Sequence, residues 1–201
     1  MPLFETSAAL LMLWAVIGYG LGSIPFGLLL TRAMGLGNLR DIGSGNIGTT
    51  NVLRTGSKAA AAMTLLLDGG KGAAAVLLAR SLAGEDTAQL AGLTAFLGHC
   101  FPIWLGFKGG KGVATFLGLM LALAWPVGIT CCATWLVAAA LSRISSMGAL
   151  AAAFAAPFWA VLFDYGNAAA LAAVLAAIVF WRHGANIARI RAGTEPKIGQ
   201  K

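Results

Sequence analysis

Charged residues are scarce in this sequence: only 10% of its 201 residues are Asp, Glu, Lys or Arg, against about 25% in ordinary soluble domains. So few charges cannot cover the surface of a water-soluble core of this size. The 59% of hydrophobic residues also exclude a disordered chain. The composition therefore predicts a membrane protein, and it argues against a role in nucleic-acid binding.

Cysteine and histidine are rarer still, with three and two residues. Cys100, Cys131 and Cys132 lie inside apolar runs, without CxxC or histidine spacing. This pattern predicts neither a disulfide framework nor a metal cluster. We expect no bound metal and no cofactor.

Long runs without charge mark the membrane spans, since a helix needs about 20 apolar residues to cross the hydrocarbon core. Six stretches qualify or nearly qualify: residues 6–31, 58–83, 87–107, 112–142, 144–163 and 165–181. The first is too long for a signal-peptide core and has no Lys or Arg before it, which predicts a retained span. The stretch 112–142 is too long for one helix, and Trp125-Pro126 near its middle predicts a hairpin of two. The expected fold is all-α, a polytopic membrane protein of about seven transmembrane helices forming a single domain, 1–201.

The distribution of charge tests this count. With the N-terminus outside and the C-terminus cytoplasmic, seven spans place all of the 14 Lys and Arg residues except Lys71 and Arg80 on the cytoplasmic side. A single span at 112–142 would move Arg143 and the tail outside. The net charge of +7 therefore reflects the positive-inside bias. Arg80 is the exception near the outer interface, where its stem can snorkel.

Polar residues gather in three segments on the predicted cytoplasmic side. The first, residues 38–54, is rich in Gly, amides, hydroxyls and Arg, which together suit a phosphate group. Gly43, Gly45 and Gly48 match GxGxxG, but they follow no strand and lie between two spans, which excludes a dinucleotide site. The alternative is a flexible loop with a helix N-cap.

The second segment, residues 98–115, contains a glycine-rich turn that leads into a helix N-terminus. It is no Walker A loop, because Gly112 rather than Ser or Thr follows Lys111. Free N–H groups and the helix dipole still favour an anion there, assisted by Lys108 and Lys111. The alternative is a basic turn that only anchors topology.

The third segment continues the last span into the tail. Arg182, Asn186 and Arg189 recur at helical spacing, and His183 shares a face with Asn186. The alternative is a basic anchor on anionic lipid.

Three ionisable residues lie inside the spans. Asp68 and Lys71 are at i, i+3, which favours a structural ion pair over a substrate contact. A structural hydrogen bond is likewise favoured for His99. The DGGKG element around Asp68 and the KGGKG element at 108–112 repeat GGKG, by duplication or by chance.

The runs GSGNIGTTNVLRTG, GHCFPIWLGFKGGKGVAT and RHGANIARIRAGTE resemble, in order, the three cytoplasmic motifs of the bacterial acyl-phosphate-dependent glycerol-3-phosphate acyltransferase family. The runs GSIPFGLLL and DGGKG are also similar to that family. Three long motifs in order on one predicted face make the match specific.

The resemblance implies a multi-pass enzyme of the bacterial inner membrane whose active site faces the cytoplasm. It would transfer an acyl group from acyl phosphate to the 1-hydroxyl of glycerol-3-phosphate, giving lysophosphatidic acid and phosphate in the first acylation step of phospholipid biosynthesis. Its partners would be these two substrates and membrane lipid. No obligate protein partner is implied. Acyl phosphate already has a good leaving group, so no covalent acyl-enzyme is expected.

The resemblance places Ser44, Arg54, His183 and Asn186 among the catalytic residues, with His183 or a substrate phosphate oxygen as the base. The residues expected to bind phosphate are Asn46, Thr50, Asn51, Gly109, Gly110, Lys111 and Gly112. A second group comprises Asp68, Lys71, His99, Lys108, Arg189 and Glu195, of which Glu195 matches a largely structural acid.

A small organophosphate transporter is the alternative function, because helix breaks and an internal echo also occur in transporters. The one-sided placement of the polar residues and the short outer loops disfavour it. A purely structural membrane subunit is a third hypothesis.

Overall fold

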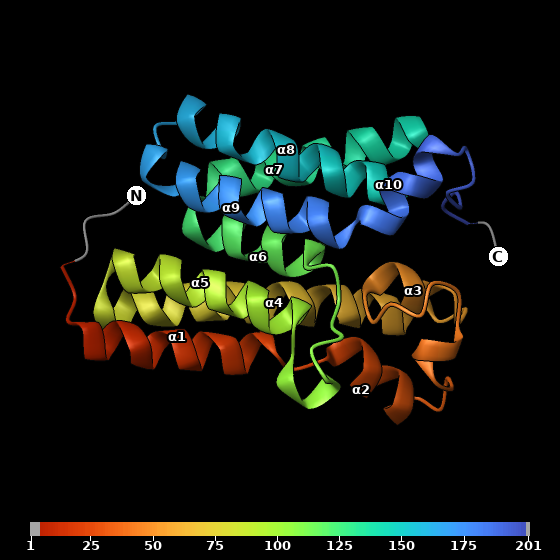
Figure 1. Ribbon diagram of the computed structural model, residues 1–201, viewed down its shortest axis with the longest axis horizontal. Coiled ribbons are helices and arrows are strands. Elements are labelled where there is room, and N and C mark those ends of the chain that lie inside the picture. Colours follow the sequence, from red (N-terminus) through yellow and green to blue (C-terminus); the bar gives the residue numbers. More distant parts are fainter. Residues whose placement is uncertain (1–4, 200–201) are drawn as a thin grey trace. The chain divides into compact units, whose positions relative to one another are not determined.

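The structure is a computed structural model. It describes residues 5–199, in which every regular element is a helix (Figure 1). These residues divide into two compact units, residues 5–123 and residues 124–199, which we call the N-terminal and C-terminal units. The single domain stays a prediction.

The N-terminal unit is built on four long helices with shorter ones between them. Its elements are α1 (Ala8–Gly22), α2 (Phe26–Ala33), η1 (Leu39–Asp41), α3 (Thr49–Leu53), α4 (Lys58–Ala83), α5 (Glu85–Cys100), η2 (Ile103–Leu105) and α6 (Val113–Leu123). Pro25, which lacks an N–H group, stands at the break between α1 and α2. Gly84 joins α4 to α5 alone, with a φ of 102° that favours glycine. Helix α5 packs against α1 and α4, and α4 also packs against α6 (Figure 1).

Small residues allow these helices to approach closely. A Cβ atom on Gly18 would lie 2.4 Å from the carbonyl oxygen of Ala91, and one on Gly22 would lie 1.9 Å from that of Ala95. Gly18 and Gly22 are four residues apart on one face of α1, the small-xxx-small spacing common in membrane helix pairs. Helices α1 and α5 therefore meet backbone to backbone.

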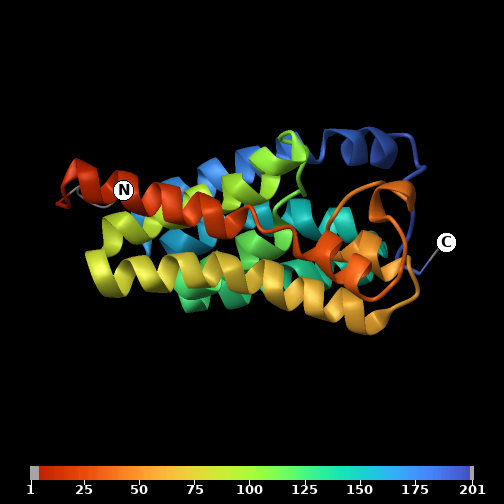
Figure 2. The same cartoon turned by 90° about the horizontal axis from the view of Figure 1, so that it is seen from below.

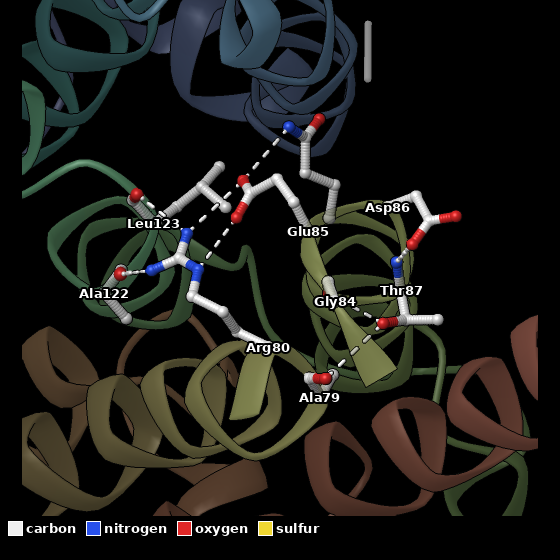
Figure 3. A network of polar contacts seen from close by, with 9 residues as sticks. Ala79, Arg80, Gly84, Glu85, Asp86, Thr87, Ala122 and Leu123 are labelled. Atoms are coloured by element: carbon white, nitrogen blue, oxygen red, sulfur yellow. Dashed lines mark hydrogen bonds and ion pairs between the residues drawn. The ribbon is translucent and has the colours of Figure 1, made fainter. Parts of the chain in front are cut away.

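Arg80 joins three helix ends of the N-terminal unit (Figure 3). Its guanidinium forms an ion pair with Glu85, with Nε 2.8 Å from Oε2, and it donates to the carbonyl oxygens of Ala122 (2.7 Å) and Leu123 (2.9 Å). A cation at the last carbonyls of α6 stabilises that helix end. The basic residue that departs from the charge sorting thus has protein partners.

The C-terminal unit contains α7 (Trp125–Ser142), α8 (Ser145–Leu162), α9 (Gly166–Arg182) and α10 (Gly184–Arg191). Helix α8 packs against both α7 and α9. The indole N–H of Trp159 donates to Oγ1 of Thr134 at 3.2 Å, which links α8 to α7. Helices α9 and α10 meet at His183 with a bend of 63°.

Five segments are long and apolar enough to cross a membrane: Ala8–Ala33, Lys58–Ala83, Glu85–Leu105, Trp125–Ser142 and Ser145–Leu162. The bent pair α9 and α10 is a sixth candidate, counted only if the two helices form one broken span. Large apolar side chains such as Leu66 (72% exposed) and Leu141 (83% exposed) point outward, as suits a lipid environment. The all-helical membrane class is confirmed.

The predicted break in the stretch 112–142 is also confirmed, because α6 ends at Leu123 and α7 begins at Trp125. Helix α6 has 11 residues, about 16 Å of helix against roughly 30 Å of hydrocarbon. The count of seven spans and their orientation stay predictions.

Candidate active site

The first motif forms a packed loop at the end where α4 begins (Figure 2, orange). Leu39, Ile47 and Val52 are at most 1% exposed, and they cluster with Leu28 of α2 and Ala60 of α4. The apolar residues between the polar ones therefore anchor the loop. This packing disfavours the alternative of a flexible loop.

Asn51 organises the polar part of this loop. Its side-chain oxygen accepts from the backbone N–H of Ser44 at 3.1 Å, and its Nδ2 donates to the carbonyl oxygens of Leu39 (3.0 Å) and Asn46 (2.8 Å). Asn46 in turn accepts from the N–H of Gly48 at 3.0 Å. Asn51 is 3% exposed. Both amides expected to bind phosphate thus hold the loop that presents Ser44.

Ser44, Thr50 and Arg54 are exposed on this scaffold. The Arg54 side chain covers Gly43, whose missing Cβ would lie 2.8 Å from Nη1 of Arg54. Gly43 has a φ of 54°, in the left-handed region. The Arg54 side chain, which follows α3, therefore lies over the turn that carries Ser44, the other residue that the resemblance places in the catalytic group.

Arg40 connects the first motif to the second. Its Nη1 donates to the carbonyl oxygen of Gly45 at 3.2 Å, and its Nη2 donates to that of Lys108. Both are contacts within the N-terminal unit. Arg40 was not predicted as a site residue, although its place inside a glycine-rich motif was a signal for such a role.

The second motif folds back onto the end of α5. The N–H groups of Gly109 and Gly110 donate to the carbonyl oxygens of Cys100 (3.1 Å) and His99 (3.0 Å). Gly112 has a φ of 84°, and its Cβ would lie 2.1 Å from the Phe96 ring. The amides of Gly109 and Gly110 are thus directed at α5, and the positive groups that follow are Lys111 and the first turn of α6.

Two bonds to α1 and the residue after it fix the segment between α5 and the turn. The Trp104 indole donates to the carbonyl oxygen of Ser23 at 2.8 Å, and the Tyr19 hydroxyl donates to that of Phe101 at 2.7 Å. The turn is therefore supported from α1 as well as from α5. Lys108 itself is exposed.

Asp68, Lys71 and His99 form a buried cluster behind this turn. Nζ of Lys71 lies 2.7 Å from Oδ1 of Asp68, so the expected ion pair is present. The same carboxylate oxygen lies 3.7 Å from Nδ1 of His99. The cluster joins α4 to α5.

The two GGKG elements differ in conformation. The first is helical within α4 and the second is a turn before α6. The first element packs against α6, the helix that follows the second element, because a Cβ on Gly118 would lie 2.1 Å from the carbonyl oxygen of Gly69. The sequence echo therefore does not correspond to a structural repeat.

The third motif lies in the C-terminal unit and centres on Glu195. Its Oε1 accepts from Oγ of Ser146 (2.7 Å) and Nδ2 of Asn186 (2.5 Å), and its Oε2 accepts from Nε of Arg189 (2.6 Å). The network ties the tail after α10 to the first turn of α8. Glu195 thus holds Asn186 in place, and its largely structural role stays a prediction.

His183 lies at the bend between α9 and α10 and is 2% exposed. Its Nδ1 is 2.8 Å from the carbonyl oxygen of Val179. Since a carbonyl only accepts, Nδ1 carries the hydrogen, and Nε2 is the basic nitrogen of the neutral ring.

Glu195 is a partly buried carboxylate outside the spans. Burial raises its pKa, but hydrogen bonds from Ser146, Asn186 and Arg189 and the Arg189 charge lower the pKa more. The net shift is downward, so the carboxylate is ionised at neutral pH. Among residues 5–199, no three His, Cys, Asp or Glu side chains gather as a metal site would require.

An all-helical membrane protein that carries two joined, glycine-rich basic loops belongs to the class of integral membrane proteins suited to anionic substrates. A family model described as glycerol-3-phosphate acyltransferase matches residues 12–193. A glycerol-3-phosphate acyltransferase of Ruegeria pomeroyi is 74% identical over 201 residues, covering 100% of this chain and 99% of the relative.

Similar solved structures are also glycerol 3-phosphate acyltransferases. A crystal structure of PlsY, an integral membrane glycerol 3-phosphate acyltransferase, in its glycerol 3-phosphate form has 35% identity and a TM-score of 0.89, covering 94% of this chain and 96% of that one. The lysophosphatidic acid form has 33% identity and a TM-score of 0.85, with 94% and 95% covered. The chain therefore belongs to the glycerol-3-phosphate acyltransferase family and is an integral membrane enzyme of phospholipid biosynthesis.

Proposed function

We propose that the enzyme transfers the acyl group of an acyl phosphate to the 1-hydroxyl of sn-glycerol-3-phosphate, giving lysophosphatidic acid and inorganic phosphate. The observation that carries this proposal is the Arg40 link, which holds the Ser44 loop and the Lys111 turn together in one unit. Two phosphate compounds suit a site with two groups of Arg, Lys and N–H donors, because charge-assisted hydrogen bonds bind phosphate strongly. Relatives in glycerol 3-phosphate and lysophosphatidic acid forms support the acceptor and the product.

Two sets of residues would hold the two phosphates. Lys111, the first turn of α6 and Ser44 bind one, and Arg54 binds the other. His183 and Asn186 of the C-terminal unit are the residues that the family resemblance adds to the substrate-binding group. The acceptor hydroxyl attacks the acyl carbon, the bond from that carbon to the phosphate oxygen breaks, and phosphate leaves. Holding both substrates in line supplies up to roughly 7–11 kcal/mol of the barrier. The acyl chain would lie in the hydrocarbon among the spans.

The deciding experiment measures phosphate release by the purified protein in detergent. Acyl phosphate with glycerol-3-phosphate is expected to release phosphate and form lysophosphatidic acid, whereas acyl-CoA and acyl carrier protein donors give no product. No release that depends on glycerol-3-phosphate would overturn the proposal. Uptake of glycerol-3-phosphate into sealed vesicles without chemistry would instead favour the transporter.

The His183→Gln variant identifies the base. We expect kcat/KM to fall by about 100-fold, because a positioned base commonly contributes about 10²–10⁴-fold. A fall in kcat assigns the hydroxyl proton to Nε2 of His183. A fall that arises only from a raised KM for glycerol-3-phosphate assigns it to a phosphate oxygen.

We propose further that the enzyme lies in a bacterial inner membrane with the three motifs facing the cytoplasm. The sorting of basic residues supports this orientation. Single cysteines introduced as Lys58→Cys and Phe163→Cys should label oppositely: an impermeant maleimide outside intact spheroplasts should modify position 163 and not position 58. The wild-type cysteines serve as background, and the reverse pattern would refute this topology.

A further inference from the structure

A charged cluster lies inside the membrane-spanning part of the N-terminal unit. Asp68, Lys71 and His99 are 1%, 6% and 4% exposed. Buried charges are costly unless they have partners, and ionisable residues inside spans are commonly functional. Lys71 and His99 also have contacts that extend beyond the cluster.

Lys71 and Asp68 form the side of the buried cluster that faces α1. Nζ of Lys71 donates to Oδ1 of Asp68 and to the carbonyl oxygen of Ile24, both at 2.7 Å. Ile24 lies at the break between α1 and α2. The ion pair therefore links α4 to the end of α1 as well as facing α5.

His99 fixes the other side, toward the glycine-rich turn. A Cβ on Gly110 would lie 2.0 Å from Nε2 of His99, so the imidazole occupies the space of a side chain at position 110. The backbone carbonyl of His99 accepts from the N–H of Gly110 at 3.0 Å. Both the ring and the main chain of His99 thus contact the residue before Lys111.

We propose that Asp68 and His99 are positioning residues, which set the place of the glycine-rich turn and hence of Lys111. The carboxylate balances Lys71 and faces Nδ1 of His99, and the opposite edge of the ring supports Gly110. This role deepens the proposed function and rests on it, because it assumes that the turn binds a substrate phosphate. The charge pair inside the span acts through the turn, without touching substrate.

Asp68→Asn and His99→Gln test the role in purified protein. Each is expected to raise KM for one phosphate substrate by about tenfold. Removing a group that orients a binding residue commonly lowers affinity by about 10- to 100-fold, and we expect the lower value here. Because the reacting groups are untouched, kcat should stay within about threefold. The double variant should raise KM no more than either single variant, since both changes release the same turn.

Asp86→Asn is the matched control. Asp86 is also a buried carboxylate of this unit, 5% exposed, and it accepts from Thr6 Oγ1 and from the N–H groups of Thr6 and Thr87. It lies at the opposite end of α5 from His99, about 20 Å away at 1.5 Å per residue. Its variant should lower the unfolding temperature while leaving KM unchanged.

A wild-type KM in Asp68→Asn, an equal rise in Asp86→Asn, or additive effects in the double variant would overturn the proposal. If Asp68→Asn does not fold, His99→Gln alone decides by the same comparison with Asp86→Asn. Stabilisation by glycerol-3-phosphate or by inorganic phosphate, measured as a shift in Tm, provides a readout without turnover. If the cluster positions the turn, Asp68→Asn and His99→Gln weaken that stabilisation even when the wild-type enzyme fails the phosphate-release assay, so the two failures are distinguishable.

Discussion

Replacing Lys111 by methionine is expected to lower kcat/KM by about 10- to 100-fold. A hydrogen bond to a charged group contributes about 1.5–3 kcal/mol, and 1.36 kcal/mol corresponds to a factor of ten in rate. Methionine keeps most of the apolar stem and removes only the charge. Lys111 directly precedes Gly112 and α6, so the phosphate it binds would also meet the positive end of that helix.

The matched control for Lys111→Met is Lys58→Met. Lys58 is exposed and begins α4, and the helix start there is capped by Ser57, which accepts from the N–H of Ala60 at 3.1 Å. Steady-state kinetics should therefore show a loss for position 111 and none for position 58, with similar unfolding temperatures. Equal rates in the two variants would remove Lys111 from the site.

Much of the fold could be predicted from the sequence because lipid imposes a simple rule on length and charge. The break at Trp125-Pro126 followed from a run too long for one helix and from a proline, and the structure has it at Ala124. The break at Pro25 was missed, because the stretch 6–31 remains apolar through it. The bend at His183 was also missed, since the tail keeps a helical period on both sides.

The sequence indicated which types of residue gather in the candidate site, but it indicated less well what each side chain contacts. The amide of Asn51 bonds the loop backbone, a role that depends on tertiary packing and that the sequence did not indicate. That Asn51 binds phosphate stays a prediction. Spacing predicted the Asp68 and Lys71 pair, since both lie on one helix. The approach of His99 to that pair joins two helices, so no local pattern could indicate it. Contacts of Arg40 and Arg80 with distant carbonyl oxygens were hidden for the same reason.

Replacing Glu195 by glutamine is expected to lower both stability and activity. Its Oε1 can be kept as the acceptor for Ser146 and Asn186, but the new amide group then faces Nε of Arg189, donor against donor. Removing one partner of a buried pair costs about 3–5 kcal/mol, and less here because the Arg189 side chain is 38% exposed and screened by solvent. The repulsion between the amide and Nε of Arg189 displaces the side chain at position 195, and Asn186 then loses its orientation. The unfolding temperature should therefore fall by several degrees, and kcat/KM by about tenfold.

The contribution of Glu195 to stability should depend on pH in a definite direction. The folded-state pKa of Glu195 lies below its ordinary value, so the ionised carboxylate stabilises the fold above the unfolded-state pKa of about 4.3. That contribution is lost as the pH falls through the lower, folded-state value. The difference in Tm between the wild type and Glu195→Gln should therefore be constant at neutral pH and should narrow below about pH 4.3.

Asp164→Asn is the control, because Asp164 is an exposed carboxylate between α8 and α9, and its positive φ of 63° suits asparagine. Its Tm difference from the wild type should be small at every pH. A Glu195→Gln enzyme with wild-type kcat/KM would show that Asn186 does not need this network. A Tm difference that widened on acidification would show that the carboxylate destabilises the fold.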